Sequence, residues 1–193
     1  MKVIAFNGSA RRDGNTAILI NKTLDRLQAA GIETELFQLA GEKIQGCKAC
    51  FQCSVKKNQR CVVDTDILND CIEKMISADG IILGSPTYFA DISPEMKALI
   101  DRSGMVARAN GDLFRRKVGA GVVAVRRAGS IHAFDSLNHF FLITQMIIPG
   151  SCYWNMGFGR EKGEVDQDDE GSTIMKVLGD NMAWLLNKLN RNA

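Results

Sequence analysis

The sequence has little that would indicate binding to nucleic acid or to a membrane. Its 24 Lys and Arg residues nearly balance 22 Asp and Glu, so the net charge is only +2 and the isoelectric point is about 8.2. A nucleic-acid-binding domain would need clustered basic faces. No apolar run approaches the about 18 residues that a membrane span needs, and no repeat or low-complexity tract is present. We therefore expect no nucleic-acid partner, no membrane partner and a cytoplasmic location.

Two nucleotide-binding signatures are also missing. The loop after the first apolar run matches neither G-x-G-x-x-G nor G-x-x-x-x-G-K-[ST], which disfavours a dinucleotide-first Rossmann fold and a P-loop NTPase. No secretory hydrophobic region is expected, because the chain reaches Asn7 and Gly8 directly after a short apolar run. A disulfide framework is therefore disfavoured for the six cysteines.

Four of those cysteines are crowded into one stretch. Cys47, Cys50, Cys53 and Cys61 have the spacing C-x2-C-x2-C-x7-C. Thiolates three residues apart can converge on one centre, and a fourth from further along can complete the coordination shell. The pattern indicates an iron-sulfur cluster; zinc is the weaker interpretation, since it usually takes paired C-x2-C units further apart. The same spacing also fits a loop that holds no metal and a loop that does redox chemistry as thiols.

Composition and periodicity predict one α/β domain over residues 1–193. With 46% hydrophobic and 24% charged residues, the chain can bury one sizeable core. We expect strands at 2–6, 33–39, 80–83, 118–125 and 147–153, and helices at 15–30, 66–76, from 93, at 132–146 and at 172–189. Right-handed crossovers between these strands give a parallel sheet covered on both faces. Ligands of such sheets bind at the carboxyl ends of the strands.

The loop after the first strand has the composition of a phosphate cradle. From Asn7 it reads N-G-S-A-R-R-D-G-N-T, in which small residues let backbone amides turn inward. The hydroxyls of Ser9 and Thr16 can form hydrogen bonds, and Arg11 supplies a fixed positive charge. The helix expected from Asn15 adds its dipole. A simple turn is the alternative interpretation of the same composition.

The loop after the third strand reads S-P-T-Y-F and offers a surface for a flat ring. Pro86 stiffens it, while Ser85 and Thr87 provide hydrogen-bonding hydroxyls. Tyr88 and Phe89 place aromatic surface at the same edge of the sheet. Adjacent aromatic residues also occur in cores and lids. The expected position opposite the first loop favours a binding function.

Taken together, the two loops resemble those of the flavodoxin-like NAD(P)H-dependent FMN reductase superfamily. The resemblance rests on G-S-x-R-x-x-G-N-T and G-S-P-T-Y, and the cysteine-rich loop at 46–62 resembles that of the iron-sulfur flavoprotein branch. It extends from Met1 to about Trp154. It implies a flavodoxin-like three-layer sandwich, with a five-stranded parallel sheet of order 2-1-3-4-5 that holds FMN non-covalently.

The resemblance also implies the residues of each site. The FMN phosphate would be bound by Ser9, Arg11, Asn15 and Thr16. The second loop would bind the cofactor through Ser85, Pro86, Thr87, Tyr88 and Phe89, the last four lining the isoalloxazine ring. Cys47, Cys50, Cys53 and Cys61 would match the family's 4Fe-4S ligands.

One loop departs from this family pattern. Such reductases often have a Gly-rich loop after the fourth strand, whereas this chain has R-R-A-G-S, which contains Arg126, Arg127 and Gly129. The two guanidinium groups can stabilise the anionic reduced flavin near its pyrimidine edge, or receive the phosphate of a nicotinamide cofactor. A solvated turn is the third interpretation.

The leading functional hypothesis is an FMN-dependent oxidoreductase. It would take electrons from a reduced donor, NAD(P)H or a redox protein, and pass them through FMN to an acceptor; no side chain need act as a general acid or base. A non-catalytic flavodoxin-type carrier is one alternative, and the isoelectric point near 8.2 speaks against it. A thiol or metal redox sensor is the second. The apolar runs at 140–143 and 153–154 are interpreted as core or as a subunit interface, and we expect a homodimer or homotetramer.

Overall fold

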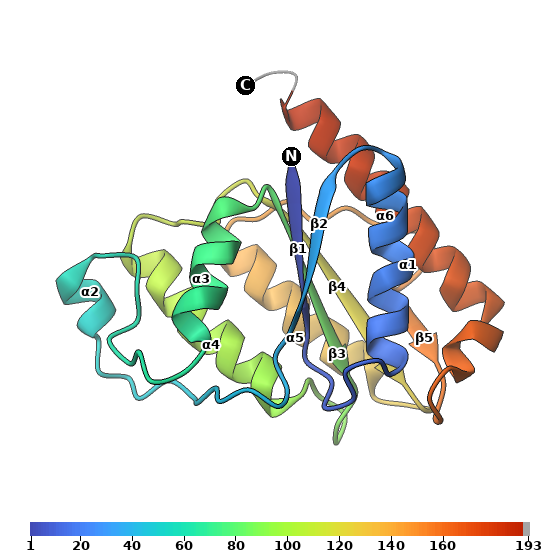
Figure 1. Cartoon of the computed structure of the whole chain (residues 1–193), viewed down its shortest axis with the longest axis horizontal. Helices are drawn as coiled ribbons and strands as arrows, with labels where there is room; N and C mark the ends of the chain where they lie inside the picture. Colours follow the sequence, from blue (N-terminus) through green and yellow to red (C-terminus); the bar gives the residue numbers. More distant parts are fainter. Residues whose placement is uncertain (191–193) are drawn as a thin grey trace.

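The computed structural model describes residues 1–190, which form a five-stranded sheet of order β2-β1-β3-β4-β5 (Figure 1). All neighbouring strands are parallel. The strands are β1 (Lys2–Asn7), β2 (Glu33–Gln38), β3 (Gly80–Pro86), β4 (Val118–Val125) and β5 (Met156–Phe158). The helices are α1 (Asn15–Ala29), α2 (Gln52–Lys56), α3 (Leu68–Ser77), α4 (Pro94–Ala109), α5 (Ser130–Ile143) and α6 (Asp169–Asn190), with a 3-10 turn, η1 (Glu164–Gln167). The predicted flavodoxin-like order is confirmed.

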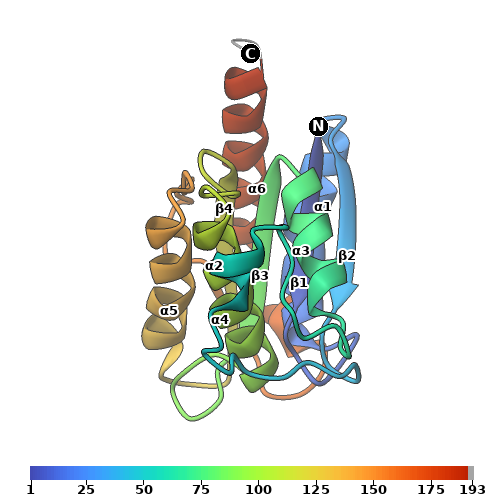
Figure 2. The same ribbon diagram turned by 90° about the vertical axis from the view of Figure 1, so that its left-hand side faces the viewer.

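Helices cover both faces of the sheet, as Figures 1 and 2 show. Helices α1 and α6 pack together on one face, whereas α3, α4 and α5 cover the other. Successive residues of β1 alternate between the two cores: Val3 and Ala5 belong to the α1/α6 side, Ile4 and Phe6 to the opposite side. This burial on both faces explains why the central strands are continuously apolar.

The start of α4 forms as its sequence predicts. Ser93 lies at the N-cap, where its hydroxyl accepts a hydrogen bond from the backbone N–H of Met96 at 3.3 Å, and Pro94 occupies the first helical turn. Because α4 follows β3 closely, this cap fixes where the loop between them must end.

The fifth strand was predicted at 147–153, and that position is wrong. Ile147 makes only an isolated bridge with Val118 before Pro149 and Gly150, and β5 forms later, at Met156–Phe158. Proline lacks the N–H that a strand interior needs, so the pairing stops there. It resumes when the backbone N–H of Val123 donates to the carbonyl of Asn155 at 2.9 Å.

The apolar run at 140–143 divides between the core and the surface. Phe140 and Phe141 are buried against the sheet, while Leu142 and Ile143 are exposed on the outer side of α5. Within residues 1–190, no helix combines the length and the apolar character needed to cross a membrane.

Candidate functional site

The loop after β1 is held from behind by two polar side chains. Asn7 and Gln38 end β1 and β2 side by side, and the Asn7 amide donates to the Gln38 side chain at 2.6 Å. Asn7 also accepts from the backbone N–H of Ser9 at 3.0 Å, and Gln38 donates to the Ser9 carbonyl at 2.6 Å. Neither residue was predicted from the sequence, although each is a polar residue that ends a strand. They hold the backbone of the loop in one conformation.

The first turn of α1 is open toward this loop. Its N-cap is Gly14, which provides no side-chain cap, and its first turn contains no acidic residue. Four N–H groups at a helix start have no partner within the helix, and the helix dipole gives them partial positive charge. The exposed Arg11 lies beside them, and its backbone N–H donates to the Ser9 hydroxyl at 3.2 Å. This arrangement suits a phosphate group.

Asn15, predicted to bind phosphate, uses its side chain to hold a neighbouring loop. Its amide group donates to the carbonyl of Glu161 at 2.9 Å and accepts from the N–H of Gly163 at 2.8 Å. The loop after β5 is thereby held against the start of α1. Thr16, also predicted, is buried in the first turn of that helix.

The end of β3 and the loop after it contain one hydroxyl that is hydrogen-bonded and one that is not. Ser85 is buried; its hydroxyl accepts from the N–H of Ser93 at 2.9 Å and donates to the carbonyl of Pro86 at 2.8 Å. It therefore fixes the loop to the start of α4. The buried hydroxyl oxygen of Thr87 has no hydrogen-bond partner among the described residues. Buried polar atoms are almost always paired, so a polar group of a ligand fits here.

A tight turn follows at the tip of this loop. Tyr88 and Asp91 exchange backbone hydrogen bonds of 2.8 and 3.0 Å across Phe89 and Ala90, whose φ angles are +47° and +64°. Phe89 is fully exposed. Positive φ is costly for residues other than glycine, and such strain gathers at ligand clamps.

Asp91 fastens this turn to α5. Its carboxylate accepts from the Ser136 hydroxyl at 2.7 Å and lies 3.5 Å from the His132 imidazole. Burial opposes ionisation, but hydrogen bonds from Ser136 and from the N–H of Ile92 hold the pKa of Asp91 below its usual value. The turn is thus anchored to α5.

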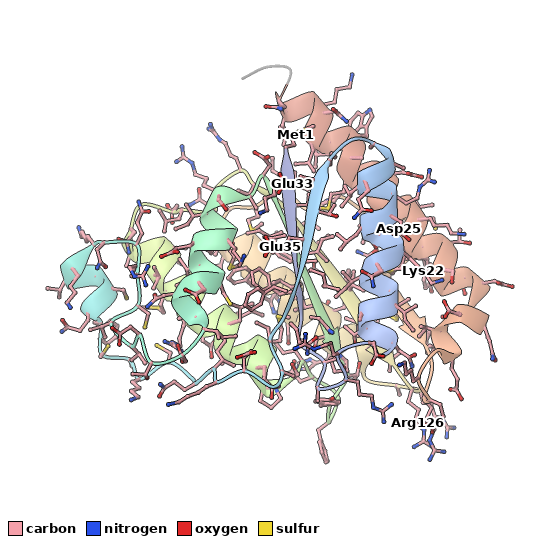
Figure 3. All side chains as sticks on the ribbon, viewed as in Figure 1. Met1, Lys22, Asp25, Glu33, Glu35 and Arg126 are labelled. Atoms are coloured by element: carbon pink, nitrogen blue, oxygen red, sulfur yellow. The ribbon has the colours of Figure 1, made fainter. Side chains whose placement is uncertain are left out.

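The three loops at the carboxyl edge of the sheet are contiguous. The N–H of Gly8 donates to the carbonyl of Gly84 at 2.8 Å, which joins the loop after β1 to the end of β3, from which the second loop leaves. Gly129 has a φ of +87°, and a side chain there would lie 2.8 Å from Ala90, so the loop after β4 touches the loop after β3. Arg126 and Arg127 are exposed, and Figure 3 shows Arg126 pointing outward beyond the edge of the sheet.

The four cysteines of the 46–62 loop line a single small cavity. Its volume is about 30 Å³, and its other walls come from Phe51, Val62, Met105, Val106 and Arg102 among others. Cys47 and Cys50 are exposed, whereas Cys53 and Cys61 are half-buried. In Figure 2 the loop folds around α2 outside α4. Within residues 1–190, no three His, Cys, Asp or Glu side chains gather closely enough to hold a metal ion.

Hydrogen bonds reach two of the cysteine sulfurs. The backbone N–H of Ala49 donates to Cys47 Sγ at 3.4 Å, and Arg102 donates to Cys61 Sγ at 3.4 Å. Hydrogen bonds to the sulfurs and the exclusion of water are the means by which proteins tune iron-sulfur clusters. The four thiols, these bonds and the apolar walls are thus of the kind that suits a thiolate-bound cluster, although the described cysteines do not converge on one point.

The remaining cysteines lie outside this loop. Cys71 is buried in α3, and burial, together with the nearby carboxylates of Asp70 and Asp66, raises the pKa of its thiol to about 12. Cys152 is exposed and lies in the connection between α5 and β5.

The family follows from a comparison with known proteins. A family model described as NADPH-dependent FMN reductase matches residues 1–161, which include all three loops and the four cysteines. The chain belongs to this family. The three contiguous loops lie at the carboxyl ends of the strands, which is where flavodoxin-like sheets bind their ligands.

Related FMN reductase sequences include proteins named iron-sulfur flavoproteins. One from Methanocaldococcus jannaschii is 35% identical over 99% of this chain and 100% of its own length. Another, from Methanosarcina thermophila, is 34% identical over 82% of this chain and 81% of its own.

Two solved structures share the fold of this chain. RosB, solved with bound 8-demethyl-8-formylriboflavin-5'-phosphate, superposes with a TM-score of 0.74 at 16% identity, over 99% of this chain and 81% of its own. An NAD(P)H:quinone oxidoreductase from Methanothermobacter marburgensis has a TM-score of 0.67 at 12% identity, over 94% and 96%. At these identities the similarity establishes the fold.

Proposed function

We propose that this protein is an FMN-dependent oxidoreductase that binds FMN across the three loops at the carboxyl edge of its sheet. Bound FMN supplies the chemistry of accepting a hydride or single electrons and passing them on. The main support from the structure is the open first turn of α1, which lies beside Arg11. The loop that leads into this turn is held by Asn7 and Gln38. We also infer that the whole chain is one domain, of which residues 191–193 lie outside the described part.

Each loop has a separate task in this proposal. Ser9, Arg11 and the N–H groups at the start of α1 bind the phosphate, with Thr16 in the same turn, while Asn15 positions the wall beside them. Pro86 and Thr87 border the ring, where the unpaired Thr87 hydroxyl is available to a polar ring atom. Tyr88 and Phe89 supply aromatic surface, and Ser85 and Gly129 set the course of the backbone.

Replacing Arg11 by Ala should weaken FMN binding by about one to two orders of magnitude, because it removes a charge-assisted contact to the phosphate. Fluorescence titration of the apoprotein with FMN measures this affinity. Arg12→Ala is the matched control, since Arg12 holds the loop through its backbone carbonyl rather than its side chain. Equal losses in the two variants would contradict the assignment of Arg11.

The arginines after β4 are proposed to act on the ring or on the electron donor. If Arg126 or Arg127 lies at the pyrimidine edge, its replacement by Ala should lower the reduction potential of the flavin, because a positive charge stabilises the anionic hydroquinone. If one of them binds the 2'-phosphate of NADPH, its replacement should raise the KM for NADPH but not for NADH. Redox titration and steady-state kinetics separate the two roles. A reduction potential and KM values equal to those of the wild type would instead support the interpretation of these arginines as part of a solvated turn.

We further propose that Cys47, Cys50, Cys53 and Cys61 bind a 4Fe-4S cluster. Support comes from their shared cavity, from the N–H groups donated to two of the sulfurs, and from the related sequences named iron-sulfur flavoproteins. The reduced donor is then NAD(P)H or a redox protein, and the acceptor is a small molecule or another redox protein.

We propose a homodimer or homotetramer that uses the outer side of α5, the connection from α5 to β5, and β5 itself. Exposed apolar side chains gather there, and such patches mark association surfaces; they are Ile131, Leu142, Ile143, Tyr153, Trp154 and Phe158. Leu142→Glu should reduce the sedimentation coefficient by breaking the assembly. Trp184→Gln, at an equally exposed position on α6, should leave it unchanged. A wild-type protein that sediments as a monomer would contradict the proposal.

A further inference from the structure

A buried ion pair lies directly behind the cysteine loop. Arg102, on α4, and Asp66 have side chains only 2% and 0% exposed, and the guanidinium donates to the carboxylate. Taking two charges out of water is costly, and a buried pair is kept only where further hydrogen bonds satisfy both groups. What these two groups bind therefore indicates their role.

Apart from the N–H of Leu68, which donates to Asp66 at 3.3 Å, the remaining hydrogen bonds of the pair go to the cysteine loop and its two ends. Arg102 donates to the carbonyl of Gln45 at 3.0 Å and to the carbonyl of Val63 at 3.1 Å. Asp66 accepts from the N–H of Gln45 at 3.1 Å. One guanidinium thus joins the chain just before Cys47 to the chain just after Cys61.

The same guanidinium also reaches a proposed ligand. Its second terminal nitrogen donates to Cys61 Sγ at 3.4 Å. The backbone of Cys61 is fixed separately by Asn69 on α3, whose side chain accepts from the Cys61 N–H at 2.8 Å and donates to its carbonyl at 3.0 Å. Cys61 is therefore anchored by side chains from two helices, and only a planar fork with several donors can make all of the Arg102 contacts at once.

We propose that Arg102, held by Asp66, is the positioning residue of the cysteine loop. It closes the loop at its base, and it directs an N–H at the sulfur of Cys61. The effect on the redox potential depends on the cluster site proposed above. The closure of the loop does not depend on it. Closure of the loop base requires no bound group.

Two consequences follow from these contacts. Without the fork, the loop should open more often and expose its backbone to proteases, since local opening is governed by the local hydrogen bonds. When a cluster is bound, the N–H to sulfur should stabilise its reduced form, which carries more negative charge, and so raise its reduction potential.

The structural consequence can be tested on the apoprotein. The loop contains trypsin sites at Lys48, Lys56, Lys57 and Arg60. Arg102→Lys keeps the charge next to Asp66 but removes the fork, and Asp66→Asn with Arg102→Gln removes both charges together. Each variant should be cleaved in the loop about tenfold faster or more, with Cys61 alkylated faster by a maleimide. Arg108→Gln, at an exposed position of the same helix, is the control.

The redox consequence is read from the midpoint potential of anaerobically reconstituted protein. Arg102→Lys should shift the potential of the iron-sulfur signal to more negative values, whereas Arg108→Gln should not move it. Unchanged cleavage, alkylation and potential in folded Arg102→Lys protein would overturn the inference. If the wild type binds no iron, the cluster assignment fails, and faster cleavage of the variants would still support the closure of the loop by Arg102.

Discussion

The protein with Cys50 replaced by Ala should lose its iron and inorganic sulfide while keeping its FMN. Cys50 is exposed and lines the cavity of the cysteine loop, but it contributes to neither core of the sheet. Its removal should therefore leave the fold and the flavin loops intact and remove one of four proposed ligands. The measurement is iron, sulfide and flavin content after anaerobic purification, together with electron paramagnetic resonance of the reduced protein.

Cys152 provides the matched control for this experiment. It is also exposed, but it lies between α5 and β5, outside the cysteine loop. Cys152→Ala should retain wild-type iron content. Equal iron content in the Cys50→Ala variant and the wild type would contradict the proposed ligand set. Stoichiometric zinc in place of iron would favour the zinc interpretation.

Replacing Asp66 by Ala should destabilise the protein by about 3 to 5 kcal/mol, because it leaves the guanidinium of Arg102 buried and unpaired. For a chain of this size each kcal/mol lowers the melting temperature by about 2 to 4 °C. Thermal and denaturant unfolding of the apoprotein measure the loss. Asp64→Ala, at an exposed carboxylate two positions away, should change stability little.

The destabilisation caused by Asp66→Ala should become smaller as the pH is lowered. Burial opposes the charge of Asp66, but hydrogen bonds from Arg102 and Gln45 hold its pKa below the usual value. A carboxylate with a depressed pKa contributes stability that is complete above its unfolded pKa, about 4, and that is lost as pH falls through the folded pKa. The difference between wild type and Asp66→Ala should therefore be constant near neutrality and shrink in acid. A difference that grows in acid would contradict this account.

Most strands of the sheet could be predicted because local signals coincide, whereas the order of the strands was implied by the resemblance of two loops to a known family. Apolar runs buried on both faces identify β1, β3 and β4, and the Ser93-Pro94 pair identifies the start of α4. The fifth strand could not be placed, because its three residues pair only after the chain has passed Pro149 and returned to β4. Short edge pairing of that kind depends on tertiary contacts rather than on local pattern.

The residues that hold the candidate sites in place were not predicted from the sequence. Gln38 acts from the end of a different strand, 31 positions from Asn7, and Arg102 reaches Cys61 across 41 positions. Nothing in the local sequence distinguishes Arg102 from the exposed Arg108 on the same helix. Only the packing of α4 against the cysteine loop gives one of them a buried partner.

Comparison of FMN with riboflavin as ligands of the apoprotein tests the central proposal most directly. The two molecules share the ring, and only FMN has the phosphate that the open first turn of α1 and Arg11 are proposed to bind. We predict that each chain binds one FMN, and that its affinity for riboflavin is at least about tenfold lower than its affinity for FMN. Equal affinities for the two ligands, or no FMN binding at micromolar concentrations, would contradict a flavin site at the carboxyl edge of this sheet.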